Sequence, residues 1–276
     1  MEVSKSEEIS KLIFNSINSQ KDKLIDQYMA SKGQIGYFYI DDLLPLDLAN
    51  KCFDFFPDKS EMHCKKSIRE YKHVSAQMDK HHQLLEDVIY AFQSESIVRL
   101  IGEICGVSSL FADESLYAGG ISLMAKDKFF HSPLDNSHDA ERERWRVFNL
   151  LYYVTPNWSL QNGGHLELWP NGPKKDPLLI ESKFNRLIVM ATHDKSWHSV
   201  NKVTVDRSRC CISNYYFSDI PLNETDKFHV TKFRGRPEDI FTNLVLDADA
   251  NVRMLIRRIF KKGIRKNPHI YKKKTN

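Results

Sequence analysis

The feature that most constrains the fold of this chain is a series of short apolar segments between residues 117 and 218. Turn-forming residues (Gly, Pro, Asn and Asp) separate these segments. Several short strands at such spacing are typical of an all-β sandwich or barrel. The segments are I-S-L-M, V-F-N-L-L-Y-Y-V, G-H-L-E-L-W, R-L-I-V-M-A-T, H-S-V and C-C-I-S-N-Y-Y-F.

The residues before this series have the period of amphipathic helices. Residues 4–32, 46–56 and 80–105 carry apolar side chains three and four positions apart, and Gly106 follows as a helix C-cap would. Between the first two, Y-F-Y-I indicates a short strand. We therefore predict an N-terminal helical region with a first β segment packing on the core (1–116), a β core (117–220), and a C-terminal segment with a basic amphipathic helix over 246–262 and a tail (221–276).

Charge is unevenly distributed along the chain, whose formal net charge is +4. Ten basic residues and no acidic one follow Asp249, so the first 249 residues hold six more acidic than basic residues. A basic tail of this kind favours contact with an anionic surface, either membrane or nucleic acid. The alternative interpretation is a solvated chain end.

The composition also indicates the cellular compartment of the protein. No apolar run approaches the roughly 20 residues that cross a bilayer, and the start M-E-V-S-K-S-E-E is acidic where a secretory signal is basic and then apolar. The five cysteines form no Cys-x-x-Cys pair, and the adjacent Cys210 and Cys211 fall on opposite faces of a strand. We predict reduced thiols in a cytoplasmic protein without a transmembrane segment.

Side chains suited to a metal and to an anion occur in the β core in a defined order. Asp135 lies in H-S-P-L-D-N-S-H-D, His198 follows about sixty residues later in S-W-H-S-V, and Arg207 and Arg209 come next. Two imidazoles and a carboxylate on one side of a metal leave the open positions of a non-haem Fe(II) oxygenase. An arginine on the following strand can pair with a co-substrate carboxylate. Alternation favours Arg209, with Arg207 as the alternative.

These segments resemble the 2-oxoglutarate- and Fe(II)-dependent oxygenases, specifically the bacterial prolyl-4-hydroxylase-like group. The resemblance runs over roughly residues 37–218. It implies a mainly β fold with flanking helices around a double-stranded β-helix (jelly roll). It also implies iron held by His-x-Asp and a distal histidine, and 2-oxoglutarate held by the iron and a late arginine. The segments that carry it include Y-A-G-G-I-S, L-D-N-S-H-D, R-V-F-N-L-L-Y-Y-V-T-P-N-W, N-G-G-H-L-E-L-W-P, S-W-H-S-V and R-C-C-I-S-N-Y-Y-F-S.

The chain departs from this family at the first iron ligand. The family reads P-H-x-D-N-S-H-D, and Pro133 stands here in place of the histidine two residues before Asp135. His131 is four residues before Asp135, about 13 Å along a straight strand, so it reaches the metal only if the strand bends at the proline. His138 is the substitute that a turn would bring within reach. A site with only two protein ligands is a further interpretation.

By resemblance, the chain is a dioxygenase that hydroxylates a C–H bond and converts O₂ and 2-oxoglutarate to succinate and CO₂. Arg209, or Arg207, and Tyr153 or Tyr152 would bind the 2-oxoglutarate carboxylate. The small-molecule or peptidyl substrate would be a prolyl residue, an amino acid, a sugar or a lipid-linked saccharide. The alternatives are a jelly-roll binding module without iron and an oxygenase whose tail, 252–274, contacts nucleic-acid phosphates.

Overall fold

The structure is a computed structural model that describes residues 4–67, 70–130, 132–234, 248–249, 251–256 and 270–271. Antiparallel β structure dominates it, as the short apolar segments predict. The strands are β1 (Tyr37–Ile40), β2 (His63–Lys66), β3 (Glu70–Ser75), β4 (Phe111–Ala112), β5 (Gly120–Met124), β6 (Phe129–Phe130), β7 (Ser132–Leu134), β8 (Trp145–Tyr153), β9 (Leu166–Leu168), β10 (Leu178–Ile180), β11 (Arg186–Ala191), β12 (His198–Val200), β13 (Arg209–Ser218) and β14 (Lys232–Arg234).

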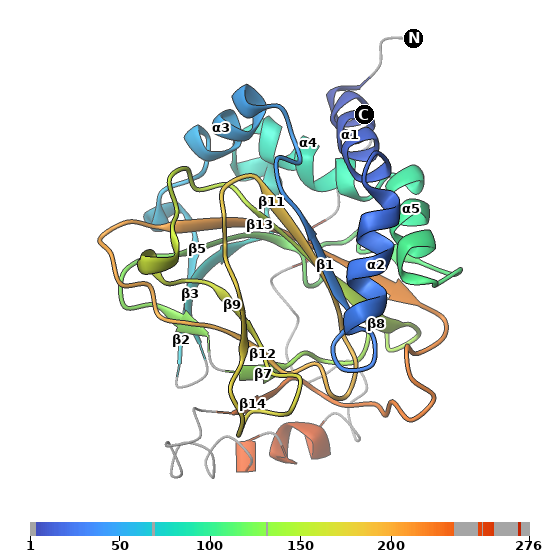
Figure 1. Cartoon of the computed structure of the whole chain (residues 1–276). Helices are drawn as coiled ribbons and strands as arrows, with labels where there is room; N and C mark the ends of the chain where they lie inside the picture. Colours follow the sequence, from blue (N-terminus) through green and yellow to red (C-terminus); the bar gives the residue numbers. More distant parts are fainter. Residues whose placement is uncertain are drawn as a thin grey trace.

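The main sheet follows the order β1-β11-β8-β13-β5-β3-β6-β12-β9-β10. It bends so that β1, β11, β8, β13, β5 and β3 form one layer and β6, β12, β9 and β10 form the other, with the small sheet β14-β7 beside them (Figure 1). The residues that face inward divide between a large core under the first layer and a smaller one between the layers. This arrangement is the predicted double-stranded β-helix, or jelly roll.

Five α-helices precede the β core, and Figure 1 shows them on the outer side of the first layer. Two predicted helices are each divided in two. The segment 4–32 breaks near Gln20, and the segment 80–105 breaks at Ser94, a residue type that favours a helix N-cap. Gly106 ends the last helix with a φ of 70°, as predicted. The helices are α1 (Lys5–Asn18), α2 (Lys21–Ser31), α3 (Leu46–Asp54), α4 (Gln83–Phe92) and α5 (Glu95–Cys105), with 3-10 turns at Lys59–Glu61, Met78–Lys80 and Leu160–Asn162.

The hairpin β2–β3 was not predicted. It lies between two helical segments, and β3 joins the main sheet between β5 and β6. Toward the other end of the chain, residues 248–249 and 251–256 are helical, while the rest of the predicted helix 246–262 lies outside the described residues. None of the described helices has the length and apolar character needed to span a membrane.

Alternation along β8 separates the two faces of the first layer. Leu150 and Tyr152 pack into the core beneath the helices, whereas Leu151 and Tyr153 face the space between the layers. In the neighbouring β13, Cys210 and Cys211 divide in the same way. One face of these strands therefore holds the fold together, and the other is available for a site.

A β-bulge changes this alternation near the start of β8. Tyr216 pairs with Phe148, but the next residue, Phe217, pairs with Arg146, so Val147 is an extra residue in β8. The bulge shifts the phase of the side chains, and Arg146 comes to line the space between the layers. A charged side chain is thereby directed inward from an apolar strand.

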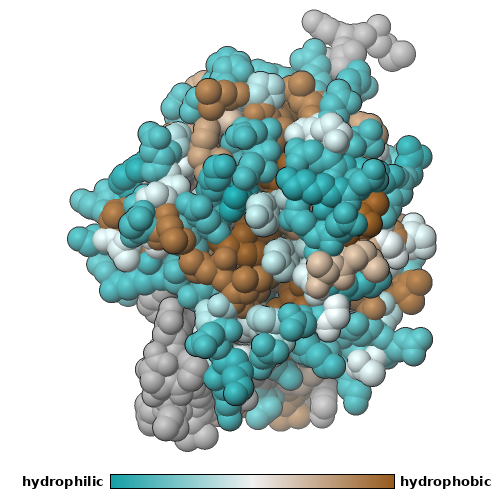
Figure 2. Space-filling view, viewed as in Figure 1, coloured by the Kyte–Doolittle hydropathy of each residue, from teal (hydrophilic) through white to brown (hydrophobic). Residues whose placement is uncertain are grey.

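Figure 2 shows the surface seen from the same side as Figure 1. Apolar side chains gather in the middle of this face, over the strands, and polar side chains surround them. Leu178 and Leu179 of β10 are exposed by 42% and 40%, which is consistent with an edge strand that ends the second layer.

Candidate functional site

A cavity of about 340 Å³ lies between the two layers. Strands β5, β8 and β13 line one side of it, and β9 and β12 line the other. Polar side chains are unusually frequent for a space inside a β sandwich, where inward positions are mainly apolar. They include Lys65, Glu70, Lys72, Tyr117, Asp135, Asn136, Arg146, Asn149, Tyr153, His198, Arg209 and Tyr215.

Asp135 and His198 meet at this cavity from two distant parts of the chain. Asp135 directly follows β7, and His198 begins β12. Nε2 of His198 lies 3.8 Å from Oδ2 of Asp135, and both side chains are buried. Nδ1 of His198 is 3.1 Å from the carbonyl oxygen of Ser196, which only accepts hydrogen bonds. In the neutral ring this contact places the proton on Nδ1 and leaves the lone pair on Nε2, the tautomer that a metal ligand at Nε2 requires.

The carboxylate of Asp135 has two further neighbours. The hydroxyl of Tyr215 donates a hydrogen bond to Oδ2 at 3.3 Å, and Nη1 of Arg146 lies 3.7 Å from the same oxygen. Burial, together with the Asp135 carboxylate, raises the pKa of Tyr215 well above its usual value, so its phenol stays a donor. The guanidinium of Arg146 also lies 4.4 Å from the ring centroid of Tyr215.

Arg146 and Tyr215 were not among the predicted site residues. The signal for Arg146 was a charge within the apolar segment W-R-V-F-N, but plain alternation places it on the helix side of the strand. Only the bulge at Val147 brings it to the cavity.

The other end of the cavity holds polar atoms with no hydrogen-bond partner among the described residues. They are Nε of Arg209 and the hydroxyl of Tyr153. Nε of Arg146 and Oδ1 of Asn149, the register partner of Tyr215, also have no hydrogen-bond partner among those residues, but they lie toward Asp135. The guanidinium of Arg209 lies 5.2 Å from the ring centroid of Tyr153, and both residues are buried. Burial raises the pKa of Tyr153 to about 12, which keeps the phenol protonated. Because unpaired buried polar groups are costly, this end of the cavity suits a polar ligand that pairs with them.

Two other predicted residues lie away from the cavity. Tyr152 points toward the helices, where its hydroxyl donates to Oδ1 of Asn185 at 2.8 Å. Arg207 is exposed and donates to the carbonyl oxygens of Pro156 and Asn157 at 2.6 and 3.0 Å. The structure thus puts Tyr153 and Arg209 together at the cavity, and puts Tyr152 and Arg207 into contacts that support the fold.

Three residues bear on the missing first iron ligand: His131, Pro133 and His138. The structure describes the last two. His131 lies outside the described residues. Pro133 is in β7, paired with Phe233 of β14. His138 is buried, with its ring 4.5 Å from that of Phe228. Among the described residues, neither His138 nor another histidine, cysteine or acid completes a close group of three ligands with the Asp135–His198 pair.

A buried aspartate fixes the loop that lines one edge of the cavity. The carboxylate of Asp113 accepts hydrogen bonds from the backbone N–H groups of Tyr117, Ala118 and Gly119 at 2.9 to 3.0 Å. Burial raises the pKa of Asp113, although these three bonds oppose the shift. Asp113 therefore positions the backbone that carries Tyr117 to the cavity.

Comparisons with known proteins agree with this description. Residues 119–217 match the family model described as "2OG-Fe(II) oxygenase superfamily". No curated protein sequence matches the chain.

Three solved structures with a similar fold are prolyl hydroxylases. A prolyl hydroxylase from Trichoplax adhaerens, in complex with a hypoxia-inducible-factor peptide fragment, is 14% identical, with a TM-score of 0.53, over 73% of this chain and 92% of the other. A Pseudomonas putida prolyl-4-hydroxylase is 16% identical, with a TM-score of 0.51, over 71% and 98%. A prolyl 4-hydroxylase from Phytophthora capsici is 15% identical, with a TM-score of 0.52, over 92% and 80%.

The fold is a jelly roll, and the aspartate and histidine that meet in its cavity are residue types that bind metal ions. More particularly, the chain matches the 2OG-Fe(II) oxygenase superfamily over residues 119–217 and shares its fold with the prolyl hydroxylases described above. It is an oxygenase enzyme, and its cofactors are Fe(II) and 2-oxoglutarate.

Proposed function

We propose that Asp135 and His198 hold Fe(II), with His131 as the third ligand, and that Arg209 and Tyr153 bind the distal carboxylate of 2-oxoglutarate. The observation that carries this proposal is the 3.8 Å between Nε2 of His198 and Oδ2 of Asp135. Ligands about 2.0 to 2.2 Å from one metal lie roughly 3 Å apart. A shift of less than about 1 Å therefore gives both atoms the same metal.

The polar groups at the opposite end of the cavity support the proposed binding of 2-oxoglutarate by Arg209 and Tyr153. A carboxylate placed there would accept hydrogen bonds from Nε of Arg209 and the hydroxyl of Tyr153, two donors without a partner among the described residues. A guanidinium and a carboxylate form strong charge-assisted hydrogen bonds. The alternatives, Arg207 and Tyr152, donate hydrogen bonds to Pro156 and Asn185 away from the cavity. We therefore propose Arg209 and Tyr153 as the residues that bind the co-substrate.

When bound, Fe(II) and 2-oxoglutarate supply the oxidative chemistry that converts a substrate C–H bond to C–OH, with O₂ consumed and succinate and CO₂ released. The residues of this chain bind and orient the reactants. Tyr215 and Arg146 hold the carboxylate of Asp135 in place, and the Ser196 carbonyl holds the imidazole of His198. Leu151 and Leu166 add apolar surface to the wall of the cavity.

The third metal position distinguishes the remaining interpretations. We propose His131 because it is the nearest histidine before Asp135 in the sequence. Residues 132–134 form the paired strand β7, so His131 reaches the metal only if the chain bends at one end of that strand. His138 has ring contact with Phe228, so its use as a ligand requires that contact to change. A site with two protein ligands would leave one more position to water. The iron-free binding module finds no stronger support than the enzyme in either the cavity or the comparisons.

For the substrate, we propose a prolyl residue in a peptide. A structure with a similar fold is a prolyl hydroxylase in complex with a peptide fragment, which supports this class. A free amino acid, a sugar and a lipid-linked saccharide are the alternatives.

The basic C-terminal tail gives a separate proposal. We propose that the ten basic residues after Asp249 contact an anionic surface. Binding to anionic vesicles or to DNA should weaken as salt is raised and should be lost when residues 250–276 are deleted. A cytoplasmic location stays a prediction from composition.

An anaerobic titration tests the metal and co-substrate assignment. Fe(II) added to the chain with 2-oxoglutarate should give a weak visible charge-transfer band, and D135N should abolish it. The charge-matched control D139N should keep the band, because Asp139 lies near Asp135 in sequence but does not line the cavity. If the unchanged chain gives no band and 2-oxoglutarate does not bind, the binding-module interpretation replaces the enzyme.

Two further variants separate the candidates for the third ligand. H131A should weaken iron binding by about tenfold or more, while H138A should leave it within about twofold. The reverse result would assign the third position to His138, and no effect from either would indicate two protein ligands.

A further inference from the structure

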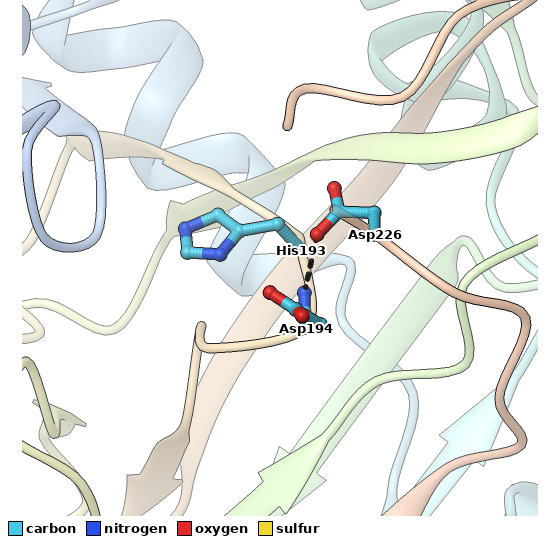
Figure 3. Close-up of side chains that lie close together, drawn as sticks. All are labelled: His193, Asp194 and Asp226. Carbon is cyan, nitrogen blue, oxygen red and sulfur yellow. Dashed lines mark hydrogen bonds between the residues drawn. The ribbon is translucent and has the colours of Figure 1, made fainter. Parts of the chain in front are cut away.

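A second group of possible metal ligands lies beside the site described above, at a small cavity that Asp135 and Arg146 also line. His193 and Asp194 follow β11, and Asp226 lies in the loop after β13. One ligand atom from each of the three lies within 4.8 Å of the others. Figure 3 shows the three side chains around a common space, with the backbone N–H of Asp194 donating to Oδ1 of Asp226 at 3.1 Å.

A buried hydroxyl at the same place points independently to a ligand. Thr192 is only 4% exposed, and its Oγ1 has no hydrogen-bond partner among the described residues. Thr192 lines a cavity of about 10 Å³ together with His193, Asp194 and Asp226. Oδ1 of Asp194 is also buried without a partner among those residues. A space of this size holds about one water molecule or one ion.

The two carboxylates beside this small cavity favour a cation, and the nearby charges of Lys195 and Lys232 oppose one. Burial raises the pKa of Asp194, and the nearby carboxylate of Asp226 raises it further. A positive ion between the two carboxylates would offset their repulsion. Arg146 lines the same cavity, but its Nη1 lies 3.7 Å from Asp135, so its charge is already matched.

We propose that His193, Asp194 and Asp226, with the hydroxyl of Thr192, form a second site for a divalent transition-metal ion. One imidazole and oxygen donors suit Mn²⁺ or Zn²⁺ better than Ca²⁺, which takes oxygen ligands throughout. The Nδ1 atom of His193 accepts a hydrogen bond from the N–H of Lys195 at 3.2 Å. Metal binding through Nδ1 would replace this contact.

The second site would act on the first through the loop between them. The hydroxyl of Ser196 donates to the carbonyl oxygen of His193 at 2.8 Å and accepts from its N–H at 2.9 Å. The carbonyl oxygen of Ser196 in turn accepts the proton on Nδ1 of His198. An ion at His193 would therefore fix the loop that orients His198, so these residues have a positioning role toward the proposed iron site.

Titration with Mn²⁺, followed by the electron paramagnetic resonance signal of the free ion, tests the second site separately from the first. In the H198A background, which removes a proposed iron ligand, the chain should still bind one Mn²⁺. Adding D194N should weaken this binding by about tenfold or more. Adding E224Q should leave it unchanged, because Glu224 is an exposed acid of the loop that holds Asp226. T192V should weaken it less than D194N.

The outcomes separate the two proposals. If H198A binds no Mn²⁺, or if D194N binds it as tightly as E224Q does, the second site is overturned, whereas the iron proposal depends on the charge-transfer band. If H198A fails to fold, the same titration on the otherwise unchanged chain should give two Mn²⁺ per chain, and one in D194N. Equal stoichiometry in these two chains would again overturn the second site.

Discussion

The two faces of strand β8 have different roles, although their residues alternate along one short segment. On one face, Leu150 and Tyr152 are fully enclosed between the sheet and the helices. On the other, Leu151 and Tyr153 border a cavity. The comparison teaches that a single strand can carry the stability of the fold and the chemistry of a site, because successive side chains point in opposite directions.

The buried hydroxyl groups on the two faces of β8 also differ in their hydrogen bonding. The hydroxyl of Tyr152 is paired with Asn185, which in turn bonds the backbone of Leu44 and so ties the sheet to the loop after β1. The hydroxyl of Tyr153 has no hydrogen-bond partner among the described residues. A paired buried hydroxyl stabilises the fold, whereas an unpaired one next to a cavity is prepared for a ligand.

The largest difference in stability is expected between the two leucines of β8. L150A should lower the free energy of unfolding by about 2 to 5 kcal/mol, because it leaves a hole in a close-packed core. L151A should cost less than half as much, because Leu151 already borders open space. Urea denaturation of both variants measures the difference, and equal losses would contradict the distinction between the faces.

The next effect concerns the two arginines near the start of β13. R209M should raise the KM for 2-oxoglutarate by about 10- to 100-fold, as expected when charge-assisted hydrogen bonds worth about 1.5 to 3 kcal/mol are lost. R207M is the matched control and should leave this KM within about twofold, since Arg207 bonds backbone carbonyls away from the cavity. Succinate formation at varied 2-oxoglutarate gives both values. A larger effect from R207M would move the co-substrate site.

A smaller effect should separate the two tyrosines. Y153F should raise the KM for 2-oxoglutarate by about two- to tenfold and leave stability nearly unchanged, because its hydroxyl has no protein partner to lose among the described residues. Y152F should do the opposite and cost about 1 to 3 kcal/mol of stability, since it leaves Asn185 with an unpaired oxygen. Kinetics and denaturation on the same two proteins decide this, and a KM effect from Y152F would refute it.

The smallest expected effect concerns an ion pair beside β1, the edge strand of the first layer. Asp41 bonds Arg186, the register partner of Tyr153. Burial alone would raise the pKa of Asp41, but the bonds to Arg186 and Lys183 outweigh it and lower the pKa. The stabilisation is therefore present above the unfolded pKa of about 3.9 and lost as pH falls through the lowered folded value.

Melting temperatures of the unchanged chain and D41N should test this. The difference between them should be constant near neutral pH and shrink below about pH 4. A difference that grows on acidification would mean that Asp41 does not gain its charge-dependent stability from Arg186.

Much of the fold is readable from local pattern. The helical period of residues 80–105 and the apolar segments from 117 onward predict elements that the structure confirms, because burial of one face imposes a period of 3.6 or 2 on the side chains. The hairpin β2–β3 was missed because its residues are mostly exposed or half-buried and charged, so no such period develops. Its place in the sheet comes from pairing with β5 and β6.

The residues of the site were harder to predict from the local sequence pattern. Alternation requires Tyr152 and Tyr153 to face opposite ways, but it does not say which of them faces a cavity. The bulge at Val147 breaks the alternation on which the prediction for Arg146 would have rested. The group of His193, Asp194 and Asp226 joins two loops that are far apart in sequence, with no shared motif.

The sequence by itself therefore determined the class of fold, the order of the helices and strands, and the side chains that could bind a metal and an anion, because these follow from period and residue type. Only the tertiary structure decided which faces enclose the cavity, how close Asp135 lies to His198, and that Arg146 joins them. The reason is physical: local pattern sets the direction of a side chain relative to its neighbours, whereas a binding site depends on distances between strands that only sheet pairing and layer packing establish.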